Sequence, residues 1–373
     1  MKKNHFSISF ILLLFLITGC QKNLNNPSEK LNSNLEANEN STKVPQSLKD
    51  FHQVNLISDL ADFNPARVDT RLNNAWGLSS SPTGIIWISS SGGGNSFVVN
   101  KEGVQAIAPV NIPSPSDLTG GGQPTGQVFN SSTGFKLPNG NAARFIFAGA
   151  EGTISGWNGG TTAVRKINKS PNSFYSGLAI ATDAGNTFLY AADFAQGKID
   201  VFDTGWNEVS KPFWDANLPA GYSPFNIQAI GNQLYVMYAK VGPDGDEVHS
   251  PGTGVVDIYN TDGSLNKRLV TNGQLNAPWG VAKAPKSFWG SEFDNTPGDA
   301  ILIGNFGDGR INAYSSEGTF LGQLRAHGEP IVIDGLWGIM FAPSTATTVD
   351  PNRLYFAAGP ADETHGLFGY IIK

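Results

Sequence analysis

The stretch LNAPWGVAKAP at residues 275–285 has two counterparts in the same chain, NNAWGLSSSP at 73–82 and DGLWGIMFAP at 334–343. Each contains Trp-Gly followed by an aliphatic residue, with a proline six positions after the tryptophan. Short apolar runs that end in such turn residues are typical of strands. Their recurrence predicts one structural unit that the chain uses several times.

The repeat becomes clearer in the residues that follow these stretches. Pairs of β-type runs, each joined by a glycine-containing turn, indicate β-hairpins. Six such pairs occur, at 84–100, 143–158, 187–203, 233–260, 300–315 and 353–371. Each is preceded by a short first strand, at 76–78, 125–127, 176–178, 226–228, 279–281 and 337–339. Weaker fourth strands follow, for example at 104–110 and 267–270. Four strands in each of six units predict an all-β, six-bladed β-propeller.

The ends of the repeat predict how the ring closes. The sixth unit stops at Lys373 after its third strand, and the segment 52–58 is a strand without a unit of its own. We expect this N-terminal strand to be the outer strand of blade six, because closure removes unpaired strand edges. The alternative, two separate three-unit domains, lacks a Pro/Ser-rich linker in the middle of the chain. We therefore assign residues 51–373 to one propeller.

The N-terminus has the features of an export signal. A basic start at Lys2 and Lys3 precedes an apolar run, and the sequence then ends in Ile-Thr-Gly-Cys at residues 17–20. This ending resembles a bacterial lipobox, which implies a signal peptide over 1–19 and lipidation of Cys20, the single cysteine in the chain. An ordinary signal peptide with a chance cysteine is the alternative. Residues 20–50 are rich in Asn, Ser, Glu and Lys, a composition typical of a flexible tether.

Composition and motifs exclude several functions. The net charge is −6 and the sequence has no basic stripe, so a nucleic-acid partner is not expected. Neither a Gly-x-Ser-x-Gly elbow nor a His-Glu-x-x-His motif is present, and the five histidines have no metal-ligand spacing. We therefore predict no cofactor, and no motif in the chain identifies an enzyme.

A propeller can also assemble a calcium site in its channel, as in calcium-dependent lactonases and phosphotriesterases. Calcium requires six or more oxygen ligands. The positions before the glycine of each first strand, or its equivalent, hold few oxygens: Trp76, Thr125, Ser176, Asn226, Trp279 and Trp337. Asn226 is the one good neutral ligand among them, although Asn74, Asn276 and Asp334 lie nearby. A Ca²⁺ site therefore remains an alternative that this ring does not favour.

Three groups of residues are candidates for ligand binding. Trp76, Trp279 and Trp337 either pack between blades or line the channel mouth, where they could stack on a ligand. Glu151, Asp193 and Asn305 follow second strands, and they either cap turns or form a polar rim. Two insertions, at 242–254 and 360–366, are either solvated loops or part of a binding surface.

From Val54 onward the chain resembles an uncharacterised family of exported bacterial propellers, some of which carry a PEP-CTERM-type C-terminal sorting tail. The segments that carry the resemblance include FIFAGAEGTISGW (145–157), LYAADFAQGKIDVFD (189–203), LNAPWGVAKAP (275–285) and GNFGDGRINAY (304–314). This chain ends at Lys373 without the tail and has Cys20 instead. The resemblance implies fold and export, but no activity. More distantly, the units resemble those of NHL-repeat propellers, many of which bind protein or RNA.

The sequence as a whole predicts a monomeric lipoprotein of the bacterial cell envelope, anchored to the outer membrane or cell surface through Cys20. We expect its propeller to bind an extracellular or periplasmic glycan, peptide or protein through the loop-rich face. The alternative is a metal-dependent hydrolase or lactonase with its site in the channel.

Overall fold

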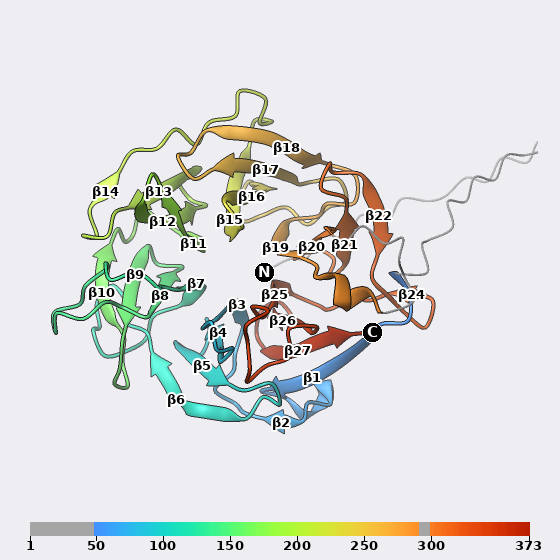
Figure 1. Ribbon diagram of the computed structural model, residues 1–373, viewed down its shortest axis with the longest axis horizontal. Coiled ribbons are helices and arrows are strands. Elements are labelled where there is room, and N and C mark those ends of the chain that lie inside the picture. The colour runs from blue at the N-terminus through green and yellow to red at the C-terminus, as the bar shows by residue number, and fades with distance from the viewer. Residues whose placement is uncertain (1–47, 291–298) are drawn as a thin grey trace, which may run out of the picture. The chain divides into compact units, whose positions relative to one another are not determined.

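The computed structural model describes residues 48–290 and 299–373, and within them the predicted six-bladed propeller is confirmed. Six sheets surround a central axis, with the first strand of each blade innermost (Figure 1), and their strands pair antiparallel apart from the short β1–β2 pair of blade six. The predicted signal peptide, Cys20 and nearly all of the tether lie outside the described residues. Among the described residues, no helix is long and apolar enough to cross a membrane.

The strands of the first five blades run outward from the channel in chain order. Blade one contains β3 (Ala75–Ser80), β4 (Ile86–Ser90), β5 (Asn95–Val99) and β6 (Gln105–Asn111). Blade two contains β7 (Pro124–Phe129), β8 (Phe145–Gly149), β9 (Thr153–Trp157) and β10 (Val164–Asn168). Blade three contains β11 (Tyr175–Asp183), β12 (Asn186–Asp193), β13 (Lys198–Phe202) and β14 (Glu208–Val209). Blade four contains β15 (Tyr222–Ile230), β16 (Gln233–Lys240), β17 (Val255–Asn260) and β18 (Leu265–Thr271). Blade five contains β19 (Pro278–Lys283), β20 (Ile301–Asn305), β21 (Ile311–Tyr314) and β22 (Phe320–Gln323).

Blade six is assembled from both ends of the propeller, as predicted. Its strands β25 (Leu336–Phe341), β26 (Leu354–Ala358) and β27 (Leu367–Ile372) are joined by β1 (His52–Ser58) and a short β2 (Arg67–Val68). β1 pairs antiparallel with β27 from His52 opposite Ile372 to Ser58 opposite Leu367. The remaining elements are a hairpin of β23 (Arg325–Ala326) and β24 (Glu329–Pro330), and two 3-10 turns, η2 (Ala61–Phe63) and η3 (Lys286–Trp289).

The buried part of the described chain begins before β1. Leu48 and Phe51 are both buried in the apolar cluster that also contains Phe288 and Trp289 of η3. The ring of Phe51 stacks on Phe288, with centroids 4.9 Å apart and planes inclined by 27°. The residues just before β1 are therefore anchored to the fifth blade by aromatic packing, in addition to the strand pairing with β27.

The recurring glycine of the innermost strands has a steric cause. A Cβ on Gly77 would lie 2.3 Å from the carbonyl oxygen of Thr125, and one on Gly338 would lie 2.7 Å from that of Trp76. Side chains do not tolerate such contacts with backbone. Neighbouring blades therefore approach each other closely at these positions, and glycine makes this approach sterically feasible.

Candidate functional site

Aromatic side chains close the middle of the channel. Trp76, Trp279 and Trp337 come from blades one, five and six and are all at least 96% buried. Trp337 lies between two rings, with its centroid 3.6 Å from that of Trp76 and 3.7 Å from that of Phe306. Trp279 meets both other tryptophans edge to face, at 6.4 Å from Trp76 and 5.9 Å from Trp337. We refer to these residues, together with Phe194, Phe225 and Phe306 of the same apolar cluster, as the aromatic plug.

A β-bulge explains why these rings point into the channel. The pairing between the first and second strands shifts register at the same place in all six blades. A bulge re-aims the side chain at the irregular position. The tryptophan of each Trp-Gly pair stands at this position, between Pro278 and Gly280 in blade five, for example.

The same register corrects one alignment from the sequence. In blade four the shift falls between Pro224 and Asn226, so Phe225 matches the tryptophans and Asn226 matches the glycines. The amide of Asn226 is engaged by backbone, because Nδ2 donates to the carbonyl of Trp279 and Oδ1 accepts from the amide of Ile227, both at 2.8 Å. Asn226 therefore does not stand at the position where the sequence placed a calcium ligand.

The sequence interpretation missed the three phenylalanines of the plug. Phe194 and Phe306 directly follow Asp193 and Asn305, at the ends of the second strands of blades three and five. An Asp/Asn-Phe pair shared by two repeat units was the available signal. The phenylalanine of each pair packs with the tryptophans of the plug, whereas the acidic or amide residue before it does not belong to this cluster.

A cavity of about 620 Å³ lies above the plug at one mouth of the channel. We call it the mouth cavity. Trp76, Trp337, Phe225 and Phe306 contribute its aromatic lining. Its polar lining includes six carboxylate residues and one histidine: Asp246, Glu247, Asp308, Asp334, Asp362, Glu363 and His249. No lysine or arginine of the described part of the chain lines it.

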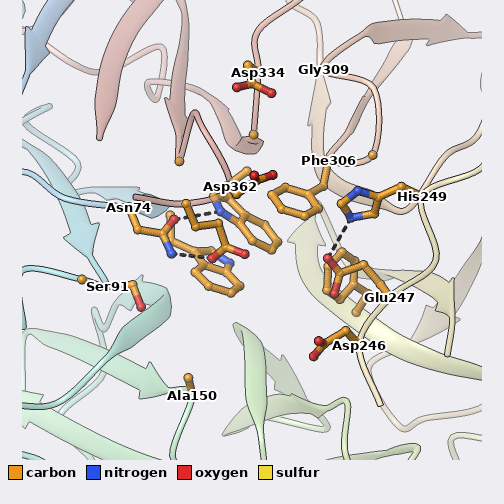
Figure 2. Close-up of a pocket in the computed structure, with 18 of the residues that line it drawn as sticks. Asn74, Ser91, Ala150, Asp246, Glu247, His249, Phe306, Gly309, Asp334 and Asp362 are labelled. Atoms are coloured by element: carbon orange, nitrogen blue, oxygen red, sulfur yellow. Dashed lines mark hydrogen bonds and ion pairs between the residues drawn. The ribbon is translucent and has the colours of Figure 1, made fainter. Parts of the chain in front are cut away.

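The two insertions singled out in the sequence meet at this cavity. Asp246, Glu247 and His249 belong to the insertion between β16 and β17, and Asp362 and Glu363 to the insertion between β26 and β27. In Figure 2, Asp246, Glu247 and His249 lie on one side of the cavity, opposite Asn74 and Ser91. Segments that are more than one hundred residues apart in the sequence thus form the walls of one cavity.

Asn74 connects the plug to the insertion of blade six. Nε1 of Trp337 donates to Oδ1 of Asn74 at 3.0 Å, and Nδ2 of Asn74 donates to Oε2 of Glu363 at 2.5 Å (Figure 2). Asn74 itself has a left-handed φ of 46°, a conformation that asparagine tolerates better than most residues. The Glu363 carboxylate is therefore held at a defined place above the aromatic rings.

The insertion of blade six has an unusual backbone. Ala361, Asp362 and Glu363 have φ values of 56°, 53° and 62°, so three consecutive non-glycine residues form a left-handed turn. Each such residue costs about 1–2 kcal/mol. The amide of Ala361 donates to Oδ2 of Asp334 at 2.8 Å, and His365 contacts Asp59 through Nδ1 at 2.8 Å. These contacts hold the turn in place, and the turn directs Asp362 and Glu363 to the cavity.

The ionisable groups of the two insertions influence one another. Burial raises the pKa of Glu363, and the negative charges of Glu247 and Asp246 raise it further, while the hydrogen bond from Asn74 opposes this shift. Nε2 of His249 lies 3.0 Å from Oε1 of Glu247, where it can donate a hydrogen bond to the carboxylate, and this contact raises the pKa of the imidazole above its ordinary value. The charges of Glu363 and Asp362 raise it as well. The cavity is thus a region of negative potential.

The other acidic candidates lie outside the mouth cavity. Asp193 is fully buried, and its Oδ1 accepts from the amides of Phe174 and Gln196. The amide of Asn305 donates to Gln274 and Asp308. Glu151 accepts from the amide of Gln123 at 3.0 Å, and burial raises its pKa. None of these three candidates lines the cavity, although Gln123, the partner of Glu151, does.

The opposite mouth of the channel differs in character. A second cavity, of about 430 Å³, includes Trp279 and Asn226 in its lining, and the rest is aliphatic, aromatic or neutral polar. None of the described residues that line it is charged. The concentration of carboxylates is therefore specific to the mouth formed by the two insertions.

The carboxylates of the mouth cavity surround the space and do not converge on one point. Within residues 48–290 and 299–373, no group of three or more His, Cys, Asp or Glu side chains is arranged to hold a metal ion. Calcium would need six or more oxygens directed at a single centre. The described residues therefore form a dispersed acidic wall, which differs from a preformed calcium site.

The ring of six blades, five of four strands and the sixth with a short fifth strand, defines the class: the chain is a six-bladed β-propeller. No family model matches it. Virginiamycin B lyase from Staphylococcus aureus has a similar fold, with a TM-score of 0.50 and 13% identity over 87% of this chain and 99% of that one. At this identity the likeness extends to the fold alone.

Two relatives have higher sequence identity. The uncharacterized protein L690 of Acanthamoeba polyphaga mimivirus is 36% identical over 267 residues, which is 67% of each chain. The uncharacterized protein R648 of the same virus is 32% identical over 327 residues, covering 83% of this chain and 77% of that one. The chain belongs to the family of these mimivirus proteins. The sequence had predicted bacterial relatives, whereas the relatives found here are viral.

Proposed function

We propose that the propeller is a binding module whose ligand occupies the mouth cavity on the loop-rich face. One observation carries this proposal: the two insertions converge over a cavity that the aromatic plug closes from below. The volume of about 620 Å³ lies within the range of small-ligand sites, roughly 300–1,000 Å³. The ligand classes expected from the sequence, a glycan, a peptide or an exposed protein segment, all remain candidates.

A cavity-filling substitution tests this proposal. Ala150 lines the cavity with a small side chain, so Ala150→Trp should obstruct it. The full-length chain would be screened against glycan and peptide libraries, with Ala106→Trp on the exposed strand β6 as the control. Ligands that bind the wild type and Ala106→Trp but not Ala150→Trp support the proposal. If Ala150→Trp leaves the affinity of a ligand unchanged, that ligand binds outside the mouth cavity, which contradicts the proposal.

We also propose that the chain is a lipoprotein of the bacterial cell envelope, anchored through Cys20 at the outer membrane or cell surface. The basic start, apolar run and Ile-Thr-Gly-Cys ending support this proposal. The resemblance to exported bacterial propellers agrees with it. Partitioning into a detergent phase tests the anchor: wild type should enter the detergent, and Cys20→Ser should remain in the aqueous phase. A Cys20→Ser variant that still enters the detergent would overturn the assignment.

A hydrolase with its site in the same cavity is the second candidate. The observation that favours it is the His249–Glu247 pair, since a histidine oriented by a carboxylate is a common general base. Turnover of lactones, esters or phosphotriesters would support this function if it requires Ca²⁺ and is lost in His249→Gln. Turnover that survives this substitution would exclude the pair as its catalytic base.

A further inference from the structure

We propose that the mouth cavity recognises an organic cation, the ammonium or guanidinium group of a lysine or arginine side chain presented by a peptide. This inference rests on the proposed function, because it names the ligand class of the same cavity. Three features of the cavity carry it: the charge of its walls, the aromatic surface beneath them, and an unpaired donor on one of the aromatic lining residues.

The first feature is the excess of negative charge. Two insertions contribute four carboxylates: Asp246, Glu247, Asp362 and Glu363. Among the described residues that line the cavity, His249 is the only one with a titratable nitrogen. Of the other two lining carboxylates, Asp308 has a cationic partner outside the lining, Arg310 at 3.3 Å, and Asp334 accepts a backbone hydrogen bond. Bringing like charges together is unfavourable unless a cation offsets them.

The dispersion of these carboxylates favours a cation with some length over a bare metal ion. Two sides of the cavity supply them, and they do not converge on one centre. An ammonium or guanidinium group has several donors that can reach carboxylates in different directions.

The turn at residues 361–363, which carries two of these carboxylates, has a left-handed backbone despite its conformational cost. Such backbone strain is common where it positions functional groups.

The second feature is the aromatic surface. Trp76, Trp337, Phe225 and Phe306 line the cavity beneath the carboxylates. Trp76 and Phe306 cover both faces of Trp337, so the faces left for a ligand belong to Trp76, Phe225 and Phe306. A cation over such a face gains about 0.5–2 kcal/mol. The aliphatic stem of a lysine or arginine can also pack on such rings while its charged end meets the acids. A neutral sugar would use the rings but would not require so many carboxylates.

The third feature is the indole nitrogen of Trp76. Trp76 lines the cavity and is 4% exposed, yet its Nε1 has no hydrogen-bond partner within residues 48–290 and 299–373. A buried, unpaired donor is costly, by about 1–3 kcal/mol. A peptide offers a carbonyl acceptor next to a basic side chain, and this acceptor would pair with the indole nitrogen once the Trp76 ring shifts to expose it to the cavity. A metal ion alone would leave this donor unpaired.

Calorimetric titration of the full-length chain tests the proposal, using acetylated pentalysine amide and pentaglutamine amide as probes. We expect pentalysine to bind and pentaglutamine to bind at least about tenfold more weakly, which corresponds to about 1.4 kcal/mol. The double variant Asp362→Asn/Glu363→Gln should weaken pentalysine binding by a similar factor. A matched control, Glu102→Gln/Glu317→Gln, removes two exposed glutamates outside the cavity and should bind like wild type. The melting temperature of each variant establishes folding, and Asp362→Asn alone replaces the double variant if that variant unfolds.

The outcomes separate this inference from the proposed function. Equal binding of the two peptides, or an equal loss in both double variants, would overturn the choice of a basic peptide. If a neutral glycan or Ca²⁺ binds the wild type and is lost in Ala150→Trp while pentalysine fails to bind, the binding function stands and the cationic ligand is wrong. If pentalysine binding survives Ala150→Trp, both proposals fail.

Discussion

Nε1 of Trp337 and the carboxylate of Glu363 hydrogen bond to opposite ends of one side-chain amide, that of Asn74, at 3.0 Å and 2.5 Å. Through this link a buried ring of the plug fixes the position of a charged group in the wall of the mouth cavity. The link joins residues that are 289 and 263 positions from Asn74 in the sequence.

Replacing Asn74 by alanine should destabilise the propeller by about 2 kcal/mol or more, because the buried indole N–H of Trp337 loses its acceptor. Alanine also fits the left-handed φ of 46° less well than asparagine. Urea unfolding gives the free energy of unfolding. The exposed Asn266→Ala is the control and should change it by less than about 0.5 kcal/mol. Equal effects of the two substitutions would contradict the role of the link.

Replacing Ala361 by glycine should stabilise the chain by up to about 1 kcal/mol, because glycine adopts a φ of 56° without the steric cost borne by alanine. The matched control is Ala106→Gly in β6, which should destabilise by about 0.5–1 kcal/mol because the backbone there is extended. Thermal unfolding of both variants measures these changes in stability, which should have opposite signs. A destabilising Ala361→Gly would show that the backbone of residues 361–363 is not left-handed.

Replacing Phe51 by alanine should cost about 3–5 kcal/mol of unfolding free energy, as for other buried phenylalanines. The ring is fully buried and packs on Phe288 and Trp289, at centroid distances of 4.9 Å and 6.3 Å. Val104→Ala, at a side chain that is 57% exposed, should change stability by less than about 0.5 kcal/mol. If Phe51→Ala is as mild as this control, the segment before β1 does not contribute to the closure of the ring.

Protonation of His249 should weaken the binding of a cationic ligand. The hydrogen bond with Glu247 and the charges of Glu363 and Asp362 raise the pKa of His249. Its positive form therefore populates at higher pH than for an ordinary histidine, and it reduces the negative potential of the cavity. Between about pH 8 and pH 6 the affinity for pentalysine should fall by about tenfold as the imidazole gains its proton.

The variant His249→Gln isolates this effect from protonation of the carboxylates, because glutamine keeps a hydrogen-bonding side chain without a charge change. Its affinity for pentalysine should be nearly constant over the same pH range. Titrations at constant ionic strength measure this, since salt also screens the carboxylates. If the affinity of His249→Gln for pentalysine changes with pH as much as that of the wild type, protonation of His249 does not control binding in the cavity.

The architecture could be predicted because its determinants are local and repeated. Alternating strands and turn glycines recur in each unit, and the Trp-Gly pair recurs in three of the six. The unpaired segment 52–58 had one plausible partner in the incomplete sixth blade. The role of the first-strand glycines could also be predicted, because the innermost strands of neighbouring blades approach each other closely.

The cavity could be predicted only in part. Both insertions stood out because they interrupt the repeat, but their meeting over one mouth depends on how the ring closes, which spacing along the chain does not reveal. The offset of one residue between Asn226 and Phe225 depends on a bulge, and a bulge leaves no clear mark in the sequence. The left-handed turn at 361–363 contains no glycine, so the usual signal for such a backbone is missing.

The location of a bound basic peptide tests the central claim most directly. A pentalysine peptide with a photoreactive diazirine at its N-terminus would be irradiated with the full-length chain, and the cross-linked residues identified by mass spectrometry. We predict cross-links to the insertions at 242–254 and 360–366, suppressed by excess unlabelled pentalysine and absent in Ala150→Trp. Cross-links confined to the opposite mouth, around Ser79 and Ser80, or to the outer strands of the blades would contradict the assignment of the mouth cavity as the binding site.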